Sequence, residues 1–128
     1  MRNLYVTLSF VMVSGILSAQ NQYTKTADKL FDRYEYVDAA KEYLKLAEGS
    51  KADNYVYKQL AESYYNVFNT KEAVKWYERA ADQGLTEALT ELGYDYKFGD
   101  MNLSVNYGKS FAYYIQAAQK GDMAGQAN

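Results

Sequence analysis

The chain has 128 residues, enough for one small domain, and its 14 basic and 16 acidic side chains give a formal net charge of −2. It has no Cys and no His, which excludes disulfides, thiolate metal sites and histidine general bases. The charge favours neither nucleic acid nor an anionic membrane surface as a partner. We therefore expect a protein without metal or cofactor that is not an enzyme, because only carboxylate chemistry remains open to it.

The first segment of the chain has the pattern of a secretory signal peptide. A short basic start, Met1-Arg2-Asn3, precedes a mainly apolar run over residues 4–17, and small residues follow at Ser18-Ala19. A membrane anchor is the alternative, but it needs roughly 20 apolar residues and this run is shorter. We expect a signal peptide over residues 1–19, cleaved after Ala19 or one residue away, and therefore an exported protein.

Two helical hairpins are predicted within residues 20–83. In the second, over residues 55–83, apolar residues recur every three or four positions on both sides of a turn at residues 68–70. On its first helix, the residues that share a face are Leu60, Ala61, Tyr64 and Phe68. Small residues alternating with rings let two antiparallel helices approach closely, as Ala61, Ala73 and Ala80 do with Tyr64, Trp76 and Tyr77. We expect Gly49 to be a left-handed cap after the first hairpin.

The two hairpins match at a constant offset of 34 residues. The matching pairs are Ala27 and Ala61, Leu30 and Tyr64, Phe31 and Tyr65, Tyr34 and Phe68, Ala39 and Ala73, and Tyr43 and Tyr77. A period of this length with small and large residues at these points is typical of tetratricopeptide repeats, which the region resembles. Two positions depart from that pattern, because Tyr57 replaces the usual tryptophan and Leu85 replaces a frequent proline.

Residues 84–121 are predicted to form a third hairpin with a different pattern. A spacing of 37 residues relates Tyr77 to Tyr114, Ala80 to Ala117 and Gly84 to Gly121. The segment resembles a Sel-one-like repeat, a glycine-punctuated relative of the tetratricopeptide hairpin, on the basis of Ala88, Leu92-Gly93, Tyr96, Gly99, Tyr113-Tyr114, Ala117-Ala118 and Gly121. We expect Gly93 to permit close helix contact, and Gly99 and Gly121 to end helices.

Residues 122–128 are predicted to be the start of a truncated further repeat. A solenoid normally ends in a polar capping helix. Without one, the last complete helix leaves four residues partly uncovered, namely Phe111, Tyr114, Ile115 and Ala118. We therefore expect either a truncated product, or docking of a partner or of a second copy at this uncapped end.

Residues 1–81 resemble the N-terminal repeat region of a group of OmpA-like periplasmic proteins of Bacteroidetes bacteria. The resemblance is carried by ADKLFDRYEYVDAAKEYLKLAEGSKADNYVYKQLAESYYNVFNTKEAVKWYERA. In that group, helical repeats precede a beta-propeller and a peptidoglycan-binding domain, and some members serve type IX secretion. The resemblance implies a periplasmic protein near the outer membrane with a role in protein assembly. We expect no direct peptidoglycan binding by this chain, because neither downstream domain occurs in these 128 residues.

Several acidic residues form pairs at the helical spacing of four, namely Asp28 with Asp32, Glu87 with Glu91, and Glu91 with Asp95. Paired carboxylates can bind a metal or perform acid–base chemistry. A solvated helix face beside lysines is the interpretation that we favour. An enzyme would instead require a cluster of buried carboxylates.

In a tetratricopeptide array, the first helix of each hairpin lines a concave groove. The positions that we project into it are Thr24, Asp28, Phe31, Asp32, Lys58, Glu62, Tyr65, Asn66, Thr90, Tyr94 and Lys97. Such a mixed aromatic and polar groove suits an extended peptide or a partner helix. A clamp for a peptide carboxylate by Lys58 and Asn66 is doubtful, because Glu62 lies between them. Phe31 and Tyr65 have an alternative role, which is to pack between hairpins.

Together these patterns predict an all-α, right-handed α-solenoid of about three antiparallel helical hairpins. Its expected function is a non-catalytic protein–protein interaction module, a scaffold or assembly adaptor, in the bacterial periplasm and associated with the outer membrane. The alternative is a truncated remnant of a larger OmpA-like envelope protein that has only a structural role.

Overall fold

The computed structural model describes the backbone of residues 22–127 and the side chains of residues 22–121. Within this range the chain forms six helices and no strand. The helices are residues 22–32, α2 (Tyr36–Ala47), α3 (Asn54–Asn66), α4 (Thr70–Asp82), α5 (Thr86–Phe98) and α6 (Tyr107–Ala127). The predicted signal peptide, residues 1–19, lies outside the described residues. In the part of the chain that the structure describes, no helix is both long and apolar enough to cross a membrane.

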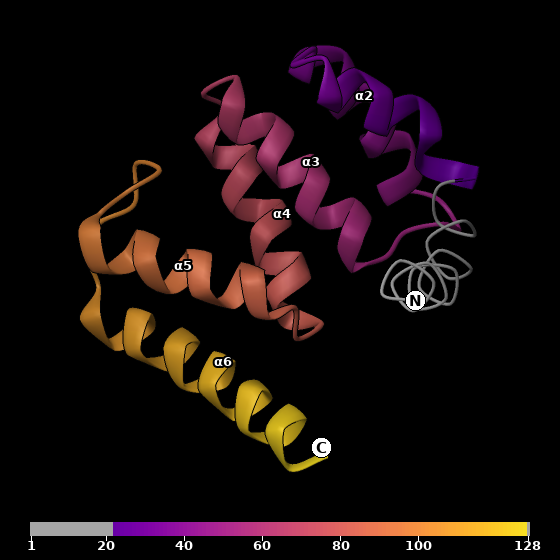
Figure 1. The fold of residues 1–128 in the computed structure, drawn as a ribbon. Helices are drawn as coiled ribbons and strands as arrows, with labels where there is room; N and C mark the ends of the chain where they lie inside the picture. The colour runs from indigo at the N-terminus through magenta and orange to yellow at the C-terminus, as the bar shows by residue number, and fades with distance from the viewer. Residues whose placement is uncertain (1–21, 128) are drawn as a thin grey trace, which may run out of the picture.

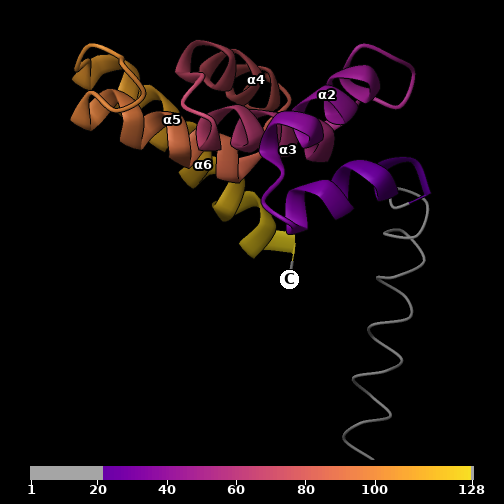
Figure 2. The same ribbon diagram turned by 90° about the horizontal axis from the view of Figure 1, so that it is seen from above.

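The helices form antiparallel hairpins that follow one another along an array (Figures 1 and 2). From α2 onward each helix packs against the next one in the chain. The helix over residues 22–32 and α2 lie at one end of the array, and α6 lies beside α5 at the other end (Figure 1). This arrangement confirms the predicted all-α repeat fold and is consistent with a solenoid.

Side-chain caps fix where the helices of the second hairpin begin. The Asp53 carboxylate accepts a hydrogen bond from the Val56 amide at 2.9 Å, and the Asn69 side chain accepts one from the Glu72 amide at 3.4 Å. Each cap satisfies a backbone donor that has no partner inside the helix. The predicted turn at residues 68–70 is confirmed, because α3 ends at Asn66 and α4 begins at Thr70.

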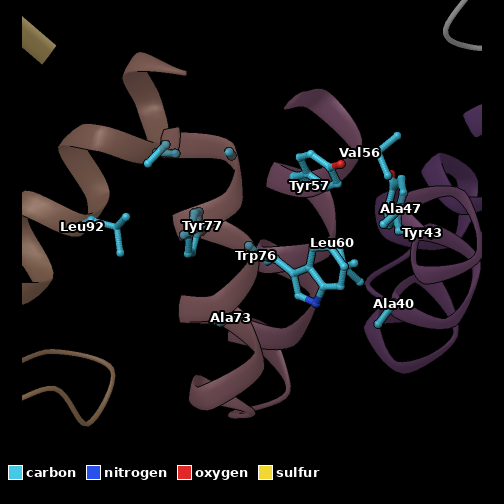
Figure 3. Packing of buried hydrophobic residues seen from close by; sticks show 14 of the residues in the cluster. Ala40, Tyr43, Ala47, Val56, Tyr57, Leu60, Ala73, Trp76, Tyr77 and Leu92 are labelled. Atoms are coloured by element: carbon cyan, nitrogen blue, oxygen red, sulfur yellow. The ribbon is translucent and has the colours of Figure 1, made fainter. Parts of the chain in front are cut away.

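The core is built from alanines that alternate with larger side chains between the helices (Figure 3). Ala61, Ala73 and Ala80 are fully buried, as the sequence predicts. The Tyr57 and Trp76 rings stack with their centroids 5.7 Å apart, so the rings fill the space beside the small residues. Close approach of α3 and α4 therefore depends on small side chains and on one aromatic pair.

Left-handed residues follow the first helix of each hairpin. Gly99 has φ 68°, as predicted for a glycine that ends a helix. In the first two hairpins Tyr34 (φ 64°) and Phe68 (φ 63°) adopt this conformation, which is strained for a bulky residue. Their rings are 78% and 89% exposed, so the prediction that Phe68 shares the packed face of α3 is wrong. Its left-handed backbone turns the ring out of the helix and into solvent.

Two other glycine predictions are wrong. Gly49 is not left-handed, because α2 ends through Glu48 (φ −90°) and the Gly49 amide donates to the Leu46 carbonyl at 3.1 Å in a right-handed turn. Gly121 does not end a helix, because α6 continues to Ala127. A glycine permits a helix to end but does not require it, since one helical glycine costs only about 1 kcal/mol.

Gly93 has the predicted role in close helix packing. A Cβ added there would lie 2.9 Å from the Tyr114 ring, and the Ser110 hydroxyl donates to the Gly93 carbonyl at 2.6 Å. This contact seats α6 on α5. Phe111 and Ile115, on the same helix, remain exposed, as predicted for an uncovered end. Docking of a partner or a second copy there stays a prediction, which light scattering on residues 20–128 would test.

Candidate binding groove

α3 and α5 are the first helices of the second and third hairpins, and an ion pair joins them directly. Lys58 Nζ lies 2.8 Å from Glu87 Oε2 across the two helices and 3.9 Å from Glu62 Oε1 on its own helix. One turn further along α5 lies the half-buried Glu91, whose pKa is raised by burial and then by the charges of Asp100 and Glu62. We call this surface the α3–α5 face and define it by Lys58, Glu62, Tyr65, Glu87, Glu91 and Tyr94.

The predicted polar groove residues of α3 already form ion pairs or hydrogen bonds within the protein. Burial raises the pKa of Glu62, Lys58 opposes this rise, and the charge of Glu87 adds to it. The exposed Asn66 side chain donates to the Glu62 carbonyl at 2.7 Å. Because Lys58 already pairs with Glu87 and Glu62, the geometry agrees with the expectation that a carboxylate clamp is doubtful.

Two tyrosines give the α3–α5 face its aromatic surface. Tyr65 on α3 is 42% exposed and Tyr94 on α5 is 47% exposed. The Tyr94 ring lies against Phe98 with centroids 4.6 Å apart. Acidic charge, first that of Asp100, raises the pKa of Tyr65, and Tyr94 contributes to the same rise. Both predicted rings are therefore accessible, one on α3 and the other on α5.

The remaining predicted residues of α5 lie on its exposed side. The Thr90 hydroxyl donates to the Glu87 carbonyl at 3.0 Å. Lys97 Nζ lies 5.2 Å from the centroid of the Phe98 ring. Both side chains are exposed, so they can border a bound partner without being part of the packed core.

Asp28 in the first hairpin connects neighbouring helices through hydrogen bonds. Its carboxylate accepts hydrogen bonds from the Thr24 hydroxyl at 2.7 Å, from the Tyr55 hydroxyl at 2.7 Å, and from the Tyr43 hydroxyl. Burial, and then hydrogen bonding to Asp28, raises the pKa of both tyrosines. The interpretation of Asp28 as part of a solvated face is therefore wrong, because the carboxylate joins the helix over residues 22–32 to α2 and α3.

The other predicted residues of the first hairpin do not join the α3–α5 face. The half-buried Phe31 ring packs edge-on against Tyr36 and Tyr43, with centroids 5.2 and 6.3 Å apart. Packing is thus the role that its contacts support. Asp32 is exposed and borders a separate surface pocket beside Tyr55.

Asp95 is the site residue whose burial the sequence analysis missed. It lies on α5 with 0% exposure, and neither carboxylate oxygen has a hydrogen-bond partner among the described residues. Burial, and then the charges of Glu91 and Asp100, raises the pKa of Asp95 to about 7. The solvated-face interpretation is wrong here. Asp95 lies three residues after Leu92 and seven after Ala88, a spacing that places it on the buried side of the helix.

A cavity of about 350 Å³ lies between the α3–α4 turn and the loop that follows α5. Its lining residues are Tyr65, Asn66, Phe68, Thr70, Gly99, Asp100, Met101 and Asn102. The Asn102 side chain donates to the Thr70 hydroxyl at 3.0 Å across the cavity, and the Asp100 amide donates to the Asp95 carbonyl at 2.9 Å. Tyr65 belongs to both the α3–α5 face and this cavity, so the two are continuous.

The chemistry that this region offers is acceptance of hydrogen bonds and contact with aromatic rings. The chain has no His and no Cys. Among the described side chains, no group of three or more His, Cys, Asp or Glu is arranged to hold a metal ion. Carboxylates beside accessible tyrosines suit a partner that carries both apolar and basic groups.

The fold is that of an all-α helical repeat protein. Within this class, residues 60–85 and 86–122 each match the Sel1 repeat. The first match begins inside α3, so the second hairpin, which resembles a tetratricopeptide repeat in its 34-residue period, also matches the Sel1 pattern. Sel1 repeats generally mediate protein–protein interactions. No curated protein and no solved structure gave a significant match.

Proposed function

We propose that this protein is a non-catalytic adaptor that binds a protein or peptide partner along the α3–α5 face. The observation that carries the proposal is the pair of accessible rings, Tyr65 and Tyr94, on two neighbouring first helices. Tyrosine is enriched among the residues that dominate binding energy, because its ring contributes a large contact area at low entropy cost. The Sel1 repeats at residues 60–122 support the same role.

The shape of the face supports an elongated partner. The Lys58–Glu87 ion pair lies towards the start of both helices, and Tyr65 and Tyr94 follow about two turns later. A bound segment that follows the helices would therefore pass from a charged region to an aromatic one. Helical or extended segments are the partners that such faces accommodate.

Site-specific photocrosslinking of the full chain in its own cell envelope tests the proposal. A photoreactive phenylalanine analogue replaces Tyr65 or Tyr94, and Tyr34 in the turn of the first hairpin is the control, because it is also exposed. We expect an adduct of the same mass from the two groove positions and none from the control. Adducts that are equally frequent from all three positions would favour a purely structural role.

A matched pair of double variants measures how much the rings contribute to binding. The test variant is Tyr65→Ala with Tyr94→Ala, and the control is Tyr23→Ala with Tyr34→Ala, which removes two other exposed rings. Truncation of a residue that dominates an interface costs about 2 kcal/mol or more, so the test variant is expected to lose most of the captured partner. Equal capture by both variants would contradict the proposal.

We also propose that the protein is exported and acts in the periplasm near the outer membrane. The pattern of residues 1–19 and the resemblance of residues 1–81 to OmpA-like periplasmic proteins support this location. Mass spectrometry of the protein isolated from cell fractions is expected to find an N-terminus near residue 20 in the envelope fraction. A chain that starts at Met1 in the cytoplasmic fraction would overturn this proposal.

A further inference from the structure

One side of α6 carries a stripe of exposed apolar side chains. Tyr107 is 70% exposed, Phe111 is 67% exposed and Ile115 is 39% exposed, and Ala118 is exposed as well. These residues are three or four positions apart, so they share one side of the helix. We call these four residues the α6 stripe. Contiguous exposed apolar side chains mark interaction sites more often than scattered ones do.

The same positions one repeat earlier are covered. The 37-residue spacing relates the α6 stripe to four residues of α4, and none of these is exposed, namely Thr70, Val74, Glu78 and Ala81. α5 follows α4 in the array and packs against it, whereas among the described residues no helix follows α6 (Figure 1). The α6 stripe therefore continues a surface that the array buries between its hairpins, and it is more apolar there, since Ile115 takes the place of Glu78.

No charged side chain competes for the α6 stripe. Among the described side chains of α6, residues 107–121, only Lys109 and Lys120 are charged, and both lie against their own chain. Lys109 Nζ is 5.1 Å from the centroid of the Tyr96 ring, and a Cβ added at Gly84 would lie 2.7 Å from Lys120 Cε. Depletion of charge distinguishes the core of an interface from ordinary surface. The surface that covers the α6 stripe should therefore be apolar too.

The opposite end of the array does not offer such a surface. Both helices at that end expose charged side chains, among them Lys29 on the helix over residues 22–32, and Asp38 and Lys41 on α2. Stacking the α6 stripe of one copy on that end of the next copy would remove these charges from water without new partners, which is costly. A head-to-tail filament is therefore disfavoured.

The α6 stripe is complementary to itself when two copies are antiparallel. Its side chains decrease in size along the helix, from Tyr107 and Phe111 through Ile115 to Ala118. With a twofold axis near residue 113, Tyr107 lies opposite Ala118 of the second copy, and Phe111 lies opposite its Ile115. Large side chains then meet smaller ones, and each lysine of α6 lies opposite an uncharged residue.

We propose that the α6 stripe pairs with the α6 stripe of a second copy in an antiparallel, twofold symmetric dimer. The inference goes beyond the proposed role of the α3–α5 face and does not depend on it, because the stripe lies on a different helix. The dimer carries two α3–α5 faces, so a partner with two binding segments gains avidity.

Sedimentation of the full chain over a series of concentrations tests the dimer. Phe111→Glu and Ile115→Glu each place an unpaired charge in the apolar interface, so each is expected to raise the dissociation constant of the dimer by about tenfold or more. Val37→Glu changes an exposed apolar residue of α2 and is expected to leave the constant unchanged. Circular dichroism checks that the variants keep their helices. A parent chain that is monomeric at every concentration, or unchanged dimers in both α6 variants, would overturn the proposal.

Crosslinking through introduced cysteines tests the antiparallel register. The chain has no Cys, so Tyr107→Cys and Ala118→Cys each supply a single thiol. When the two variants are mixed and oxidised, the antiparallel pair brings the thiol of one variant to that of the other. We expect the mixed disulfide to exceed the half of the product that random pairing would give. A majority of symmetric disulfides would overturn the antiparallel pairing.

A photoreactive analogue at Phe111 distinguishes a second copy from a different protein. In the cell, an adduct with twice the mass of the chain is expected, and an adduct of another mass alone would overturn the second copy as the occupant. A monomeric chain that keeps its photocrosslinks from Tyr65 would reject the dimer and leave the proposed adaptor function in place. A dimer that gives no crosslinks from Tyr65 or Tyr94 would reject the α3–α5 face and support the dimer.

Discussion

The first hairpin partly buries Asp28 and the third fully buries Asp95, and these two aspartates of the first helices differ in their hydrogen bonding. Asp28 accepts hydrogen bonds from three hydroxyl groups, two of which come from other helices. Asp95 is more deeply buried, yet neither of its oxygens accepts a hydrogen bond from a described residue. A carboxylate that is satisfied by hydrogen bonds within the chain stabilises the array, and a buried one that is left unsatisfied reduces its stability.

The turns of the same two hairpins also differ, because the backbone strain is in the first hairpin and not in the third. The first hairpin places a bulky residue, Tyr34, in the left-handed conformation, and the third uses Gly99 at the corresponding point. The strain of the first hairpin thus lies in its turn, and that of the third lies in its buried acid. Each difference can be removed by one substitution.

The largest effect is expected from Asp28→Ala, which removes the acceptor shared by Thr24, Tyr43 and Tyr55. We expect the free energy of unfolding, measured with urea, to fall by about 3 kcal/mol, because buried hydroxyls lose a charged partner. Asp32→Ala changes an exposed acid on the same helix and is expected to alter stability by less than about 0.5 kcal/mol. Equal losses in the two variants would show that the hydrogen bonds of Asp28 add nothing to stability, and Asp28 would then offer no contrast to Asp95.

Asp95→Asn is expected to increase the free energy of unfolding, whereas Asp28→Ala lowers it. The pKa of Asp95 is raised to about 7, so between about pH 4 and pH 7 the folded chain holds a proton that the unfolded chain has released. Stability therefore falls as the pH rises through this window, and the ionised acid continues to destabilise the fold above it. We expect the variant to be more stable than the parent by about 1–3 kcal/mol at pH 8.

Urea unfolding at several pH values checks that sign. At pH 4 the protonated Asp95 and an asparagine are both uncharged, so the two proteins are expected to have nearly equal stability. Part of the slope remains in the variant, because burial also raises the pKa of the nearby Glu62 and Glu91. A variant less stable than the parent at pH 8 would show that the ionised carboxylate has a stabilising partner within the chain.

A smaller gain is expected from Tyr34→Gly, which relieves the left-handed strain in the first turn. A residue with a Cβ costs about 1–2 kcal/mol in this conformation. Glycine removes this cost, but part of the gain in stability is lost because glycine raises the conformational entropy of the unfolded chain. We expect a net gain of about 0.5–1 kcal/mol in urea unfolding. Tyr34→Ala is the control, because it removes the exposed ring and keeps the strain. Equal stability of the two variants would argue that the turn is not strained.

The smallest effect is expected at the Lys58–Glu87 ion pair, which joins α3 to α5 near the surface. A double-mutant cycle with Lys58→Met and Glu87→Gln is expected to give a coupling energy below about 1 kcal/mol, because Glu87 is largely exposed. A coupling near that of a buried pair, about 3 kcal/mol, would indicate that the two helices depend on this contact for their relative position.

The repeat fold was predictable because its signals are local. Apolar residues recur with helical spacing, and buried alanines such as Ala61 and Ala73 recur where two helices must approach. The glycine predictions succeeded at Gly99 and failed at Gly49 and Gly121. The sequence shows where a glycine can adopt the left-handed conformation at low energetic cost, but neighbouring contacts decide whether it does so.

The two aspartates show what the candidate site required beyond sequence. The partners of Asp28 include Tyr43 and Tyr55, which lie 15 and 27 residues away, so no local pattern identifies them. The burial of Asp95 could be read from its spacing to Leu92, but its lack of a partner could not, because that depends on what every packed neighbour offers. Helical spacing did place the accessible Tyr65 and Tyr94 correctly on the first helices of their hairpins.

Trp76 is the sole tryptophan of the chain, and it is buried against Tyr57 at the centre of the array. Its fluorescence therefore reports on the packing of α3 against α4, whereas circular dichroism reports on all helices together. Repeat arrays can open one unit at a time. Coincident denaturation curves from the two signals would mean that this short array unfolds as a single cooperative unit, and separate curves would reveal hairpins that open independently.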